Sequence, residues 1–311
     1  MSAVLHRPET IEEACALLAA DPSAMAFGGG TAIQILRKQG ILFAESFVDL
    51  SRIAGLRDIS RTANGLRAGP MVTIRRMENT PLVRDVAPLA AAAYGKVANP
   101  RVRNTASIGG NVAHGDYRLD PPVALLALGG AIEATSSAGR RTIPADGFFV
   151  DFQQTDLRPG ELVTAIEIPA MPARATASYA KLSSLSANDW PSASAAALLA
   201  PTSAGGRDDR LTLRLAIGAL APVPRLGTAD VTGRTEEEVV EAALEIAETL
   251  MDPIPDVRGG VEYKRTIGRV AVEDAVRGAW KARGEHEARG EHTARGEYEA
   301  RGEHEEGEAR G

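Results

Sequence analysis

Two glycine-rich segments limit most strongly what this chain can fold into. The first is Phe27-Gly28-Gly29-Gly30-Thr31, and the second, about eighty residues later, is Thr105-Ala106-Ser107-Ile108-Gly109-Gly110-Asn111. Glycine lets successive backbone amides turn toward one point, and it lets the backbone approach a ligand closely. We therefore predict that the two turns hold one anionic ligand between them. A dinucleotide pyrophosphate is the natural candidate.

The first turn matches neither of two common phosphate motifs. The Rossmann spacing would need glycine at Ile33, and the Gly-Lys-Ser/Thr of a Walker A loop does not follow. A triple glycine on its own is equally compatible with a plain tight turn. Its position between a strand candidate at 24–27 and a helix candidate at 32–37 favours anion binding, because a helix N-terminus presents free amides and a positive dipole end. Thr31 adds a hydroxyl donor.

The second turn is followed by a concentration of polar side chains. Ser107, Asn111, Asp116 and Asp120 all lie within fourteen positions. An aspartate that follows a phosphate loop can accept hydrogen bonds from ribose hydroxyls. Asp120 could equally cap a helix predicted at 121–128, and the sequence alone does not separate these two roles.

Composition excludes several classes of protein. The 311 residues suit two or three domains, and a hydrophobic content of 44% supports a full core. A net charge of −6 argues against a nucleic-acid or anionic-membrane partner. The single cysteine, Cys15, excludes internal disulfides and is too few for an iron–sulfur cluster, which needs about four thiolates. We expect Cys15 to be a buried small side chain on the apolar side of a helix.

No segment resembles a membrane anchor or a secretion signal. Residues 1–8 contain no apolar signal core, and no run of about 18 apolar residues occurs. The sequence therefore predicts a cytoplasmic protein without a membrane span.

The order of strand-like and helix-like segments predicts three folded units and a tail. Residues 1–56 alternate as a small α/β subdomain, and 57–174 form a second subdomain of mixed strands and helices. Residues 175–281 are predicted to form a three-stranded antiparallel sheet with helices on one face. Residues 282–311 repeat a six-residue unit, first seen as Ala-Arg-Gly-Glu-His-Glu, with five arginines and nine glutamates. This composition predicts a disordered, solvated tail, in which His286, His292 and His304 bind no metal.

Together, these motifs resemble the FAD-binding medium subunit of the molybdenum hydroxylases, the family of xanthine dehydrogenase and aerobic carbon monoxide dehydrogenase. The family's first motif, Ala-Gly-Gly-Thr/His-Asp/Ser-Leu, is similar to residues 28–33, and its Thr-Ile-Gly-Gly-Asn motif is similar to residues 107–111. The segment 99–104, the spacing of Asp116 and Asp120, Tyr179-x-Lys181, Asp189 and the segment 262–265 add to the likeness. The resemblance covers about residues 3–281.

The resemblance implies an α+β fold: a two-subdomain FAD-binding module of the PCMH-type flavoprotein fold, followed by a small C-terminal domain. It implies that both turns cradle the pyrophosphate, that Val97 lies against the cofactor, that Asp120 contacts the ribityl or ribose portion, and that Lys181 approaches the flavin. Trp190 falls where the family places residues near the isoalloxazine ring, although an aromatic there is more often packing. The expected cofactor-binding set is Ala26, Phe27, Gly28, Gly29, Gly30, Thr31, Ala32, Ile33, Val97, Ser107, Ile108, Gly109, Gly110, Asn111, Asp116, Asp120, Lys181 and Trp190.

The sequence departs from the family pattern at two positions. Ala32 stands where Asp or Ser is usual, which removes one side-chain contact to the cofactor. Leu185 stands where many members have arginine, which leaves flavin tuning and acceptor choice open.

By the same resemblance, the function is that of an FAD-carrying oxidoreductase subunit for electron transfer, with no catalytic or metal-binding residue of its own. Molybdopterin would be held by a large partner subunit and two iron–sulfur clusters by a small one, in a heterotrimer that is expected to pair as a dimer of trimers. Two alternatives are a free-standing flavin oxidoreductase and a scaffold subunit that has lost its cofactor. The substrate, the final electron acceptor and the role of the tail are not specified by this chain.

Overall fold

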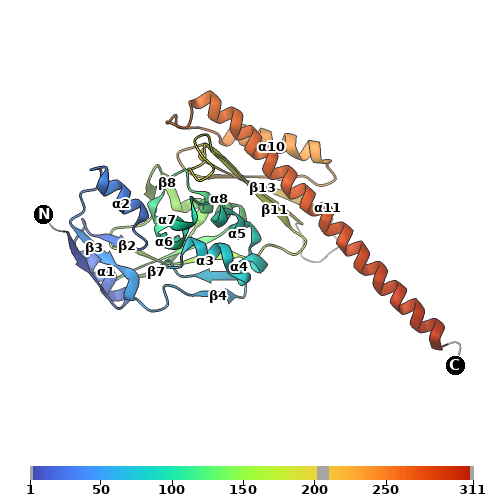
Figure 1. Cartoon of the computed structure of the whole chain (residues 1–311), viewed down its shortest axis with the longest axis horizontal. Helices are drawn as coiled ribbons and strands as arrows, with labels where there is room; N and C mark the ends of the chain where they lie inside the picture. Colours follow the sequence, from blue (N-terminus) through green and yellow to red (C-terminus); the bar gives the residue numbers. More distant parts are fainter. Residues whose placement is uncertain (1–2, 202–209, 309–311) are drawn as a thin grey trace.

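The computed structural model describes residues 3–201 and 210–308, with side chains as far as residue 285. Its strands form a small parallel sheet, a larger antiparallel sheet and a second antiparallel sheet, in chain order (Figure 1). The fold class is therefore α+β, as the sequence predicted. The described chain contains no helix that is long and apolar enough to cross a membrane.

The first sheet has the strand order β1-β3-β2, with β1 (Val4–His6), β2 (Met25–Phe27) and β3 (Ser46–Asp49) in parallel pairs. Helix α1 (Ile11–Ala20) begins at Thr10, whose Oγ1 accepts a hydrogen bond from the Glu13 amide at 3.1 Å. Helix α2 (Thr31–Lys38) follows β2 through the first glycine turn. The 3-10 turn η1 (Leu50–Arg52) leads out of this unit.

Cys15 joins the first unit to the second. It is buried, and its Sγ lies 3.3 Å from the Thr135 carbonyl oxygen in the larger sheet. Burial raises the pKa of the Cys15 thiol, and the nearby Glu12 charge raises it further. The prediction of a buried cysteine is confirmed.

The second sheet has the order β4-β5-β10-β6-β7 and is antiparallel throughout. Its strands are β4 (Ile59–Thr62), β5 (Gly65–Ala68), β6 (Ala131–Ser136), β7 (Gly139–Pro144) and β10 (Leu162–Pro169). The helices of this unit are α3 (Ile74–Asn79), α4 (Pro81–Val86), α5 (Pro88–Gly95), α6 (Pro100–Thr105), α7 (Ile108–His114), α8 (Asp120–Leu128) and the short α9 (Ala145–Phe148). A small hairpin of β8 (Phe149–Asp151) and β9 (Gln154–Thr155) follows α9.

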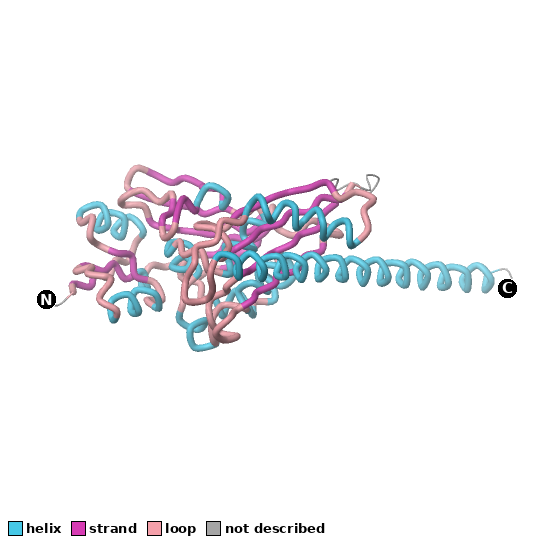
Figure 2. The backbone as a smooth tube through the Cα atoms, turned by 90° about the horizontal axis from the view of Figure 1, so that it is seen from above, coloured by secondary structure: helices cyan, strands magenta, loops and turns pink. Residues whose placement is uncertain are grey.

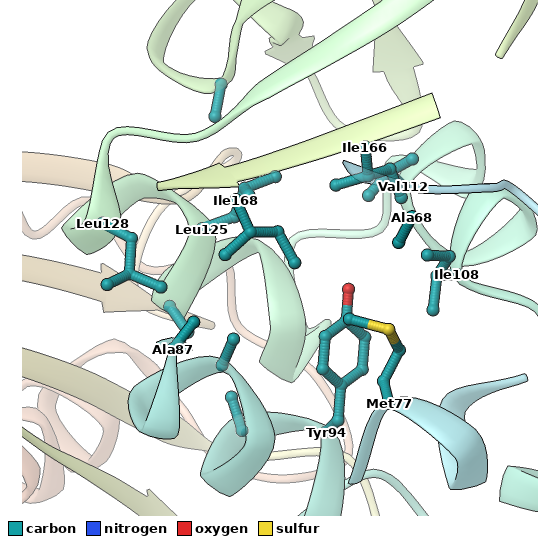
Figure 3. Close-up of a cluster of buried hydrophobic side chains, with 14 of the residues drawn as sticks. Ala68, Met77, Ala87, Tyr94, Ile108, Val112, Leu125, Leu128, Ile166 and Ile168 are labelled. Carbon is teal, nitrogen blue, oxygen red and sulfur yellow. The ribbon is translucent and has the colours of Figure 1, made fainter. Parts of the chain in front are cut away.

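The core of the second unit lies between these helices and the sheet. Figure 3 shows Tyr94 and Met77 from the helices facing Ile166 and Ile168 of β10, with Ile108 and Val112 of α7 beside them. Every residue of α8 is buried, because this helix also contacts β12 (Ala193–Pro201) and β13 (Leu211–Gly218) of the third unit. The second glycine-rich segment therefore lies next to a fully buried helix and the main core cluster.

The third sheet corrects the prediction of three strands. As described, it has four, β11 (Thr176–Leu182), β12 (Ala193–Pro201), β13 (Leu211–Gly218) and β14 (Arg225–Asp230), each antiparallel to the next. The fourth strand is an edge strand whose side chains are exposed or half-buried, so it lacks the apolar alternation that identifies the other three. Helices α10 (Glu236–Leu250) and α11 (Val261–Glu308) cover one face of this sheet (Figure 1).

Helix α11 continues well past the folded body. Among the side chains that the structure describes, the last buried one in this helix is Ala279, and the helix itself extends away from the sheet as far as Glu308 (Figure 2). Where composition predicted disordered chain, the structure has helix, because alanine, arginine and glutamate are strong helix formers even without a core. The side chains of His286, His292 and His304 lie outside those that the structure describes.

Candidate cofactor site

The two glycine turns lie against each other. A Cβ built on Gly28 would come within 2.6 Å of Ser107 Oγ, and one built on Gly29 would overlap the Thr105 carbonyl oxygen. Side chains at these positions would therefore push the turns apart. The two segments are therefore neighbours in the fold, and part of their glycine content is needed for this packing and not for a ligand.

The first turn supplies free backbone donors. Gly30 is the N-cap of α2 and has a φ of +68°, in the left-handed region that favours glycine. No side chain caps this helix. The amides of Thr31, Ala32 and Ile33 in its first turn have no intrahelical acceptor, and the dipole adds positive potential there. This helix end can bind an anion.

The second turn is the beginning of α7, and its amides are already used. The Ile108 amide donates to the Val72 carbonyl at 2.9 Å, the Gly109 amide to the Pro70 carbonyl at 2.8 Å, and the Gly110 amide to Ser107 Oγ at 3.2 Å. The second turn therefore does not present these amides to a ligand, and ligand binding by the amides of the first turn stays a prediction. Local pairing satisfies the donors of the second turn, because its short helix is anchored on the chain after β5.

Asn111 gives the second turn a different role. It is 9% exposed, and its Oδ1 atom is buried without a hydrogen-bond partner among the described residues. A buried acceptor of this kind costs about 1–3 kcal/mol if it stays unpaired. A ligand hydroxyl or N–H would satisfy it.

A cavity of about 290 Å³ lies between the two turns. This volume is at the lower end of the range for small-molecule sites, which is about 300–1,000 Å³. A separate, more open surface hollow beside β1 and α1 contains neither turn. The predicted residues that line the cavity are Ala26, Gly28, Gly29, Gly30, Thr31, Ala32, Ile33, Val97, Ser107, Gly110, Asn111 and Trp190.

The other predicted residues do not line the cavity. Phe27 turns toward Phe47, with its ring edge-on at 6.0 Å between centroids, and Ile108 is fully buried in the core. A Cβ on Gly109 would overlap Pro70, so this glycine is needed for packing. Asp116, Asp120 and Lys181 are engaged with protein partners.

Asp120 and Lys181 bind each other. Lys181 Nζ lies 2.9 Å from Asp120 Oδ2 and 2.8 Å from the Lys96 carbonyl oxygen, and the Tyr179 hydroxyl donates to Asp120 Oδ1 at 2.7 Å. Burial raises the pKa of Asp120, and the charge of Lys181 offsets this only in part. The pair ties the start of α8 to β11, behind the cavity wall. Their contacts to a cofactor stay a prediction.

Asp116 is paired with a residue that the sequence analysis missed. Arg118 donates to both of its carboxylate oxygens, at 2.8 and 2.7 Å. Burial alone would raise the pKa of Asp116, but the hydrogen bonds and charge of Arg118 hold it below its usual range. The guanidinium of Arg118 also lies 4.0 Å from the centroid of the Trp190 ring. Spacing alone gave no signal for this stack, because the two residues are 72 positions apart.

A strained turn forms another part of the wall. Val97 and Ala98 line the cavity, and Ala98 has a φ of +41°, which is uncommon for a residue with a side chain. The buried Arg103 donates to both of their carbonyl oxygens at 2.8 Å and to Glu78 at 3.0 Å. Arg103 thus holds this turn in place, and its role could not be read from the motif.

His114 also lines the cavity without having been predicted. It is the last residue of α7, and burial lowers its pKa, so the imidazole is neutral at pH 7. Among the departures from the motif, Ala32 lies at the cavity and Leu185 is 60% exposed outside it.

Taken together, the cavity fits a flavin dinucleotide. An uncapped helix end suits phosphate, Asn111 Oδ1 suits a ligand hydroxyl, and apolar side chains with an indole suit ring systems. These features define an anion- and ring-binding site of the kind found in dinucleotide-binding proteins.

Comparison with known proteins agrees with this class. Residues 1–171 match the family described as the FAD binding domain in molybdopterin dehydrogenase. The chain is 33% identical to the nicotine 6-hydroxylase medium subunit of Paenarthrobacter nicotinovorans, over 87% of this chain and 96% of that one. It is 30% identical to the carbon monoxide dehydrogenase medium chain of Hydrogenophaga pseudoflava, over 88% and 96%.

Solved structures show the same likeness. Carbon monoxide dehydrogenase from Hydrogenophaga pseudoflava aligns with a TM-score of 0.83 at 30% identity, covering 91% of this chain and 98% of that one. Quinoline 2-oxidoreductase from Pseudomonas putida 86 aligns with a TM-score of 0.81 at 26% identity, covering 91% and 98%. The chain belongs to the family of FAD-binding medium subunits of the molybdenum hydroxylases, and it is an oxidoreductase flavoprotein subunit.

Proposed function

We propose that this chain is the electron-output subunit of a heterotrimeric molybdenum hydroxylase. In this proposal it holds FAD between the two glycine turns, takes electrons from iron–sulfur clusters of a small partner subunit, and passes them to an external acceptor. A large partner subunit would hold molybdopterin, and the trimers would pair. The proposal includes a cytoplasmic location and the unit boundaries 1–56, 57–174 and 175–281.

The observation that supports it most strongly is the uncapped N-terminus of α2 at a glycine-lined cavity. The amides of Thr31, Ala32 and Ile33 and the Thr31 hydroxyl would hold the phosphates. Each charge-assisted hydrogen bond to a phosphate contributes about 1.5–3 kcal/mol, so several of them suffice without a lysine.

The remaining contacts follow from chemical type. Asn111 Oδ1 is an acceptor, so it would pair with a hydroxyl of the ligand and not with a phosphate oxygen. Val97 and Ala98 offer an apolar surface, and Trp190 offers the face or edge of an indole. When bound, FAD supplies the ability to accept electrons singly and to release them singly or as hydride.

The need for partners follows from what the chain contains. One cysteine cannot ligate an iron–sulfur cluster, so any such cluster that supplies electrons to this chain must lie in another polypeptide. The named relatives are medium subunits or chains of enzymes that act on nicotine and carbon monoxide. The substrate would bind to the large subunit, so the residues of this chain would not determine which substrate is used.

The test is metal and flavin analysis of the complex purified from its native source through a tag on this chain. We expect this chain, a larger and a smaller polypeptide, and FAD, molybdenum and iron in the same fractions. Flavin without molybdenum or iron would support the free-standing oxidoreductase instead. A colourless complex would support the scaffold alternative.

A further inference from the structure

Three segments far apart in the sequence meet at Trp190. The indole lines the cofactor cavity from the connection between β11 and β12. The Arg118 guanidinium lies 4.0 Å from its ring centroid, and the Arg258 guanidinium lies 5.5 Å from it. Arg118 follows α7, and Arg258 precedes α11. The wall of the cavity is therefore assembled from both the second and the third units.

Each guanidinium is held by a carboxylate with two hydrogen bonds. Arg118 donates from Nε and Nη2 to Asp116 at 2.8 and 2.7 Å. Arg258 donates from Nε and Nη2 to Asp189, both at 2.9 Å. Asp256 lies 3.7 Å from Arg118 and 3.8 Å from Arg258 and so joins the two pairs. A planar guanidinium fixed by a bidentate carboxylate has little freedom to leave the ring beneath it.

The charges of this cluster are balanced and sheltered. Lys264 is fully buried, 3.0 Å from Asp256, and Tyr117 donates its hydroxyl to the same carboxylate at 3.1 Å. The side chains of Arg118 and Arg258 are 15% and 13% exposed. A cation over an indole contributes about 0.5–1 kcal/mol when exposed and about 2 kcal/mol when desolvated, so the shelter strengthens the stack.

The segment that contains Trp190 is a connection between strands, and its Leu185 is largely exposed. Hydrogen bonds hold the rest of the segment: Ser184 Oγ donates to the Arg258 carbonyl at 2.9 Å, the Ser192 amide donates to the Leu182 carbonyl at 2.8 Å, and Arg258 binds Asp189. These bonds hold the neighbours of Trp190, whereas the two guanidinium groups contact the indole itself.

We propose that Arg118 is a positioning residue which, together with Arg258, fixes the Trp190 indole as a wall of the cofactor cavity and so determines the surroundings of the ring that binds there. The fixed indole is a property of the chain without ligand. Its effect on the flavin rests on the proposed function.

Lysine cannot replace arginine in this role. An ammonium group keeps the charge but loses the planar stack and the two-point bond to Asp116. We therefore expect Arg118→Lys to behave like Arg118→Ala, whereas a purely electrostatic role would be preserved in the lysine variant.

The first test uses the ligand-free chain. The sequence contains two tryptophans, so a Trp280→Phe background leaves Trp190 as the reporter. In that background we expect Arg118→Ala and Arg118→Lys each to raise the acrylamide quenching constant of Trp190 severalfold and to lower its fluorescence anisotropy. Arg61→Ala is the matched control, because it breaks an exposed pair with Asp85 at 2.7 Å and should change neither value. Unchanged quenching in both Arg118 variants would overturn the proposal.

If Arg118→Ala fails to fold, Asp189→Asn provides a second route to the same result. It removes the bidentate partner of Arg258 while keeping the side-chain volume, and it should also raise the quenching of Trp190. A folded Asp189→Asn variant with wild-type quenching would contradict the proposal that the two arginines fix the indole.

The second test adds FAD. We expect Arg118→Ala to weaken FAD binding and shift the flavin absorption bands, and to have no additional effect in a Trp190→Phe background, because the arginine acts through the indole. Equal effects of Arg118→Ala in both backgrounds would contradict this coupling. The two proposals can fail separately. If the quenching test shows that Arg118 fixes the indole but the chain with Arg118 intact binds no FAD, the proposed function is overturned and the positioning role stands.

Discussion

Gly110 is the glycine of the second turn with the most open space at the position of a side chain. A Cβ there would meet Ser107 Oγ at 3.0 Å and no other atom within 4 Å, and the residue lines the cavity. We expect Gly110→Val to fold with near-wild-type stability and to lose FAD, because its methyl groups would occupy the ligand volume. The measurement is FAD binding by fluorescence titration alongside thermal unfolding.

Gly147 provides the matched control for this substitution. A Cβ at Gly147 meets nothing within 4 Å, and the residue does not line the cavity. Gly147→Val should retain FAD. Wild-type FAD occupancy in Gly110→Val would show that the second turn does not border the ligand.

Substitution of Asn111 should affect the stability of the free chain and its FAD binding differently. Replacing it with leucine removes a buried unpaired acceptor, which is close to neutral or stabilising for the free chain. The same change should weaken FAD binding by about 1–3 kcal/mol if a ligand hydroxyl pairs with Oδ1. Thermal unfolding without ligand and a binding titration measure the two effects. A variant that is destabilised without ligand and binds FAD normally would assign Asn111 to the fold instead.

At the scale of single residues, the sequence identified those cavity residues whose placement depends on local backbone geometry. Gly28 to Ile33 are contiguous, so their motif implies a turn and a helix end together. The ion pair between Asp120 and Lys181 joins residues that tertiary packing brings together, whereas Asp116 is paired with Arg118 two positions along the chain. Arg118 and Arg103 were missed because their contacts with Trp190 and Glu78 join residues that are far apart in the sequence.

Among the secondary-structure elements, helices α2 and α7 differ in whether their first backbone amides have acceptors within the protein. The helix end of α2 keeps its amides free, whereas α7 uses Ser107 as its N-cap and pairs its other first amides with the chain at 70–72. Both begin with glycine-rich sequence. Only the acceptors around each helix distinguish a ligand-binding turn from a structural one.

The ionic cluster between the second and third units should make stability depend on acid pH. Burial opposes ionisation of Asp116, Asp189 and Asp256, but their arginine and lysine partners outweigh it and lower the pKa of all three. An aspartate with a lowered folded pKa stabilises the protein above its unfolded pKa of about 3.9 and loses that contribution as pH falls through the folded value.

Unfolding by urea from pH 3 to 7 measures this dependence. We expect a constant midpoint above about pH 5 and a decline below about pH 4. Asp116→Asn should be destabilised by about 3 kcal/mol at pH 7, because it leaves Arg118 without its closest partner. The difference from wild type should shrink toward pH 3. A difference that stays constant across this range would rule out the ion pair as its source.

At the scale of the whole molecule, the order of strand-like and helix-like segments predicted the α+β class. It did not predict the edge strand of the third sheet. The strands at 162–169 and 193–201 are buried apolar runs, which is the kind of strand that sequence patterns identify. The polar edge strand β14 was not, because exposed edges lack apolar periodicity. The repeat after residue 281 has alanines and one tyrosine as its apolar residues, too few for a core, so composition predicted disorder where helix propensity favours a helix.

Removing the repeat should leave the folded body unchanged. Up to residue 285, where the described side chains end, the last buried side chain of α11 is Ala279, and Trp280 is half-buried beside the same core. A chain that ends at Lys281 should unfold at the same temperature as the full chain and bind FAD equally. A chain that ends before Ala271 should not fold, because it loses the buried residues that α11 packs on the third sheet. A large stability loss in the Lys281 truncation would show that the repeat contacts the body.

The central claim is that two glycine turns, brought together by the fold, hold one FAD. The most direct measurement is the visible spectrum of the isolated full-length chain after incubation with FAD and gel filtration. We predict a flavin spectrum with shifted bands, equimolar FAD released on denaturation, and loss of both in Gly110→Val. A folded wild-type chain that elutes without flavin, or a Gly110→Val variant that retains it, would contradict the account.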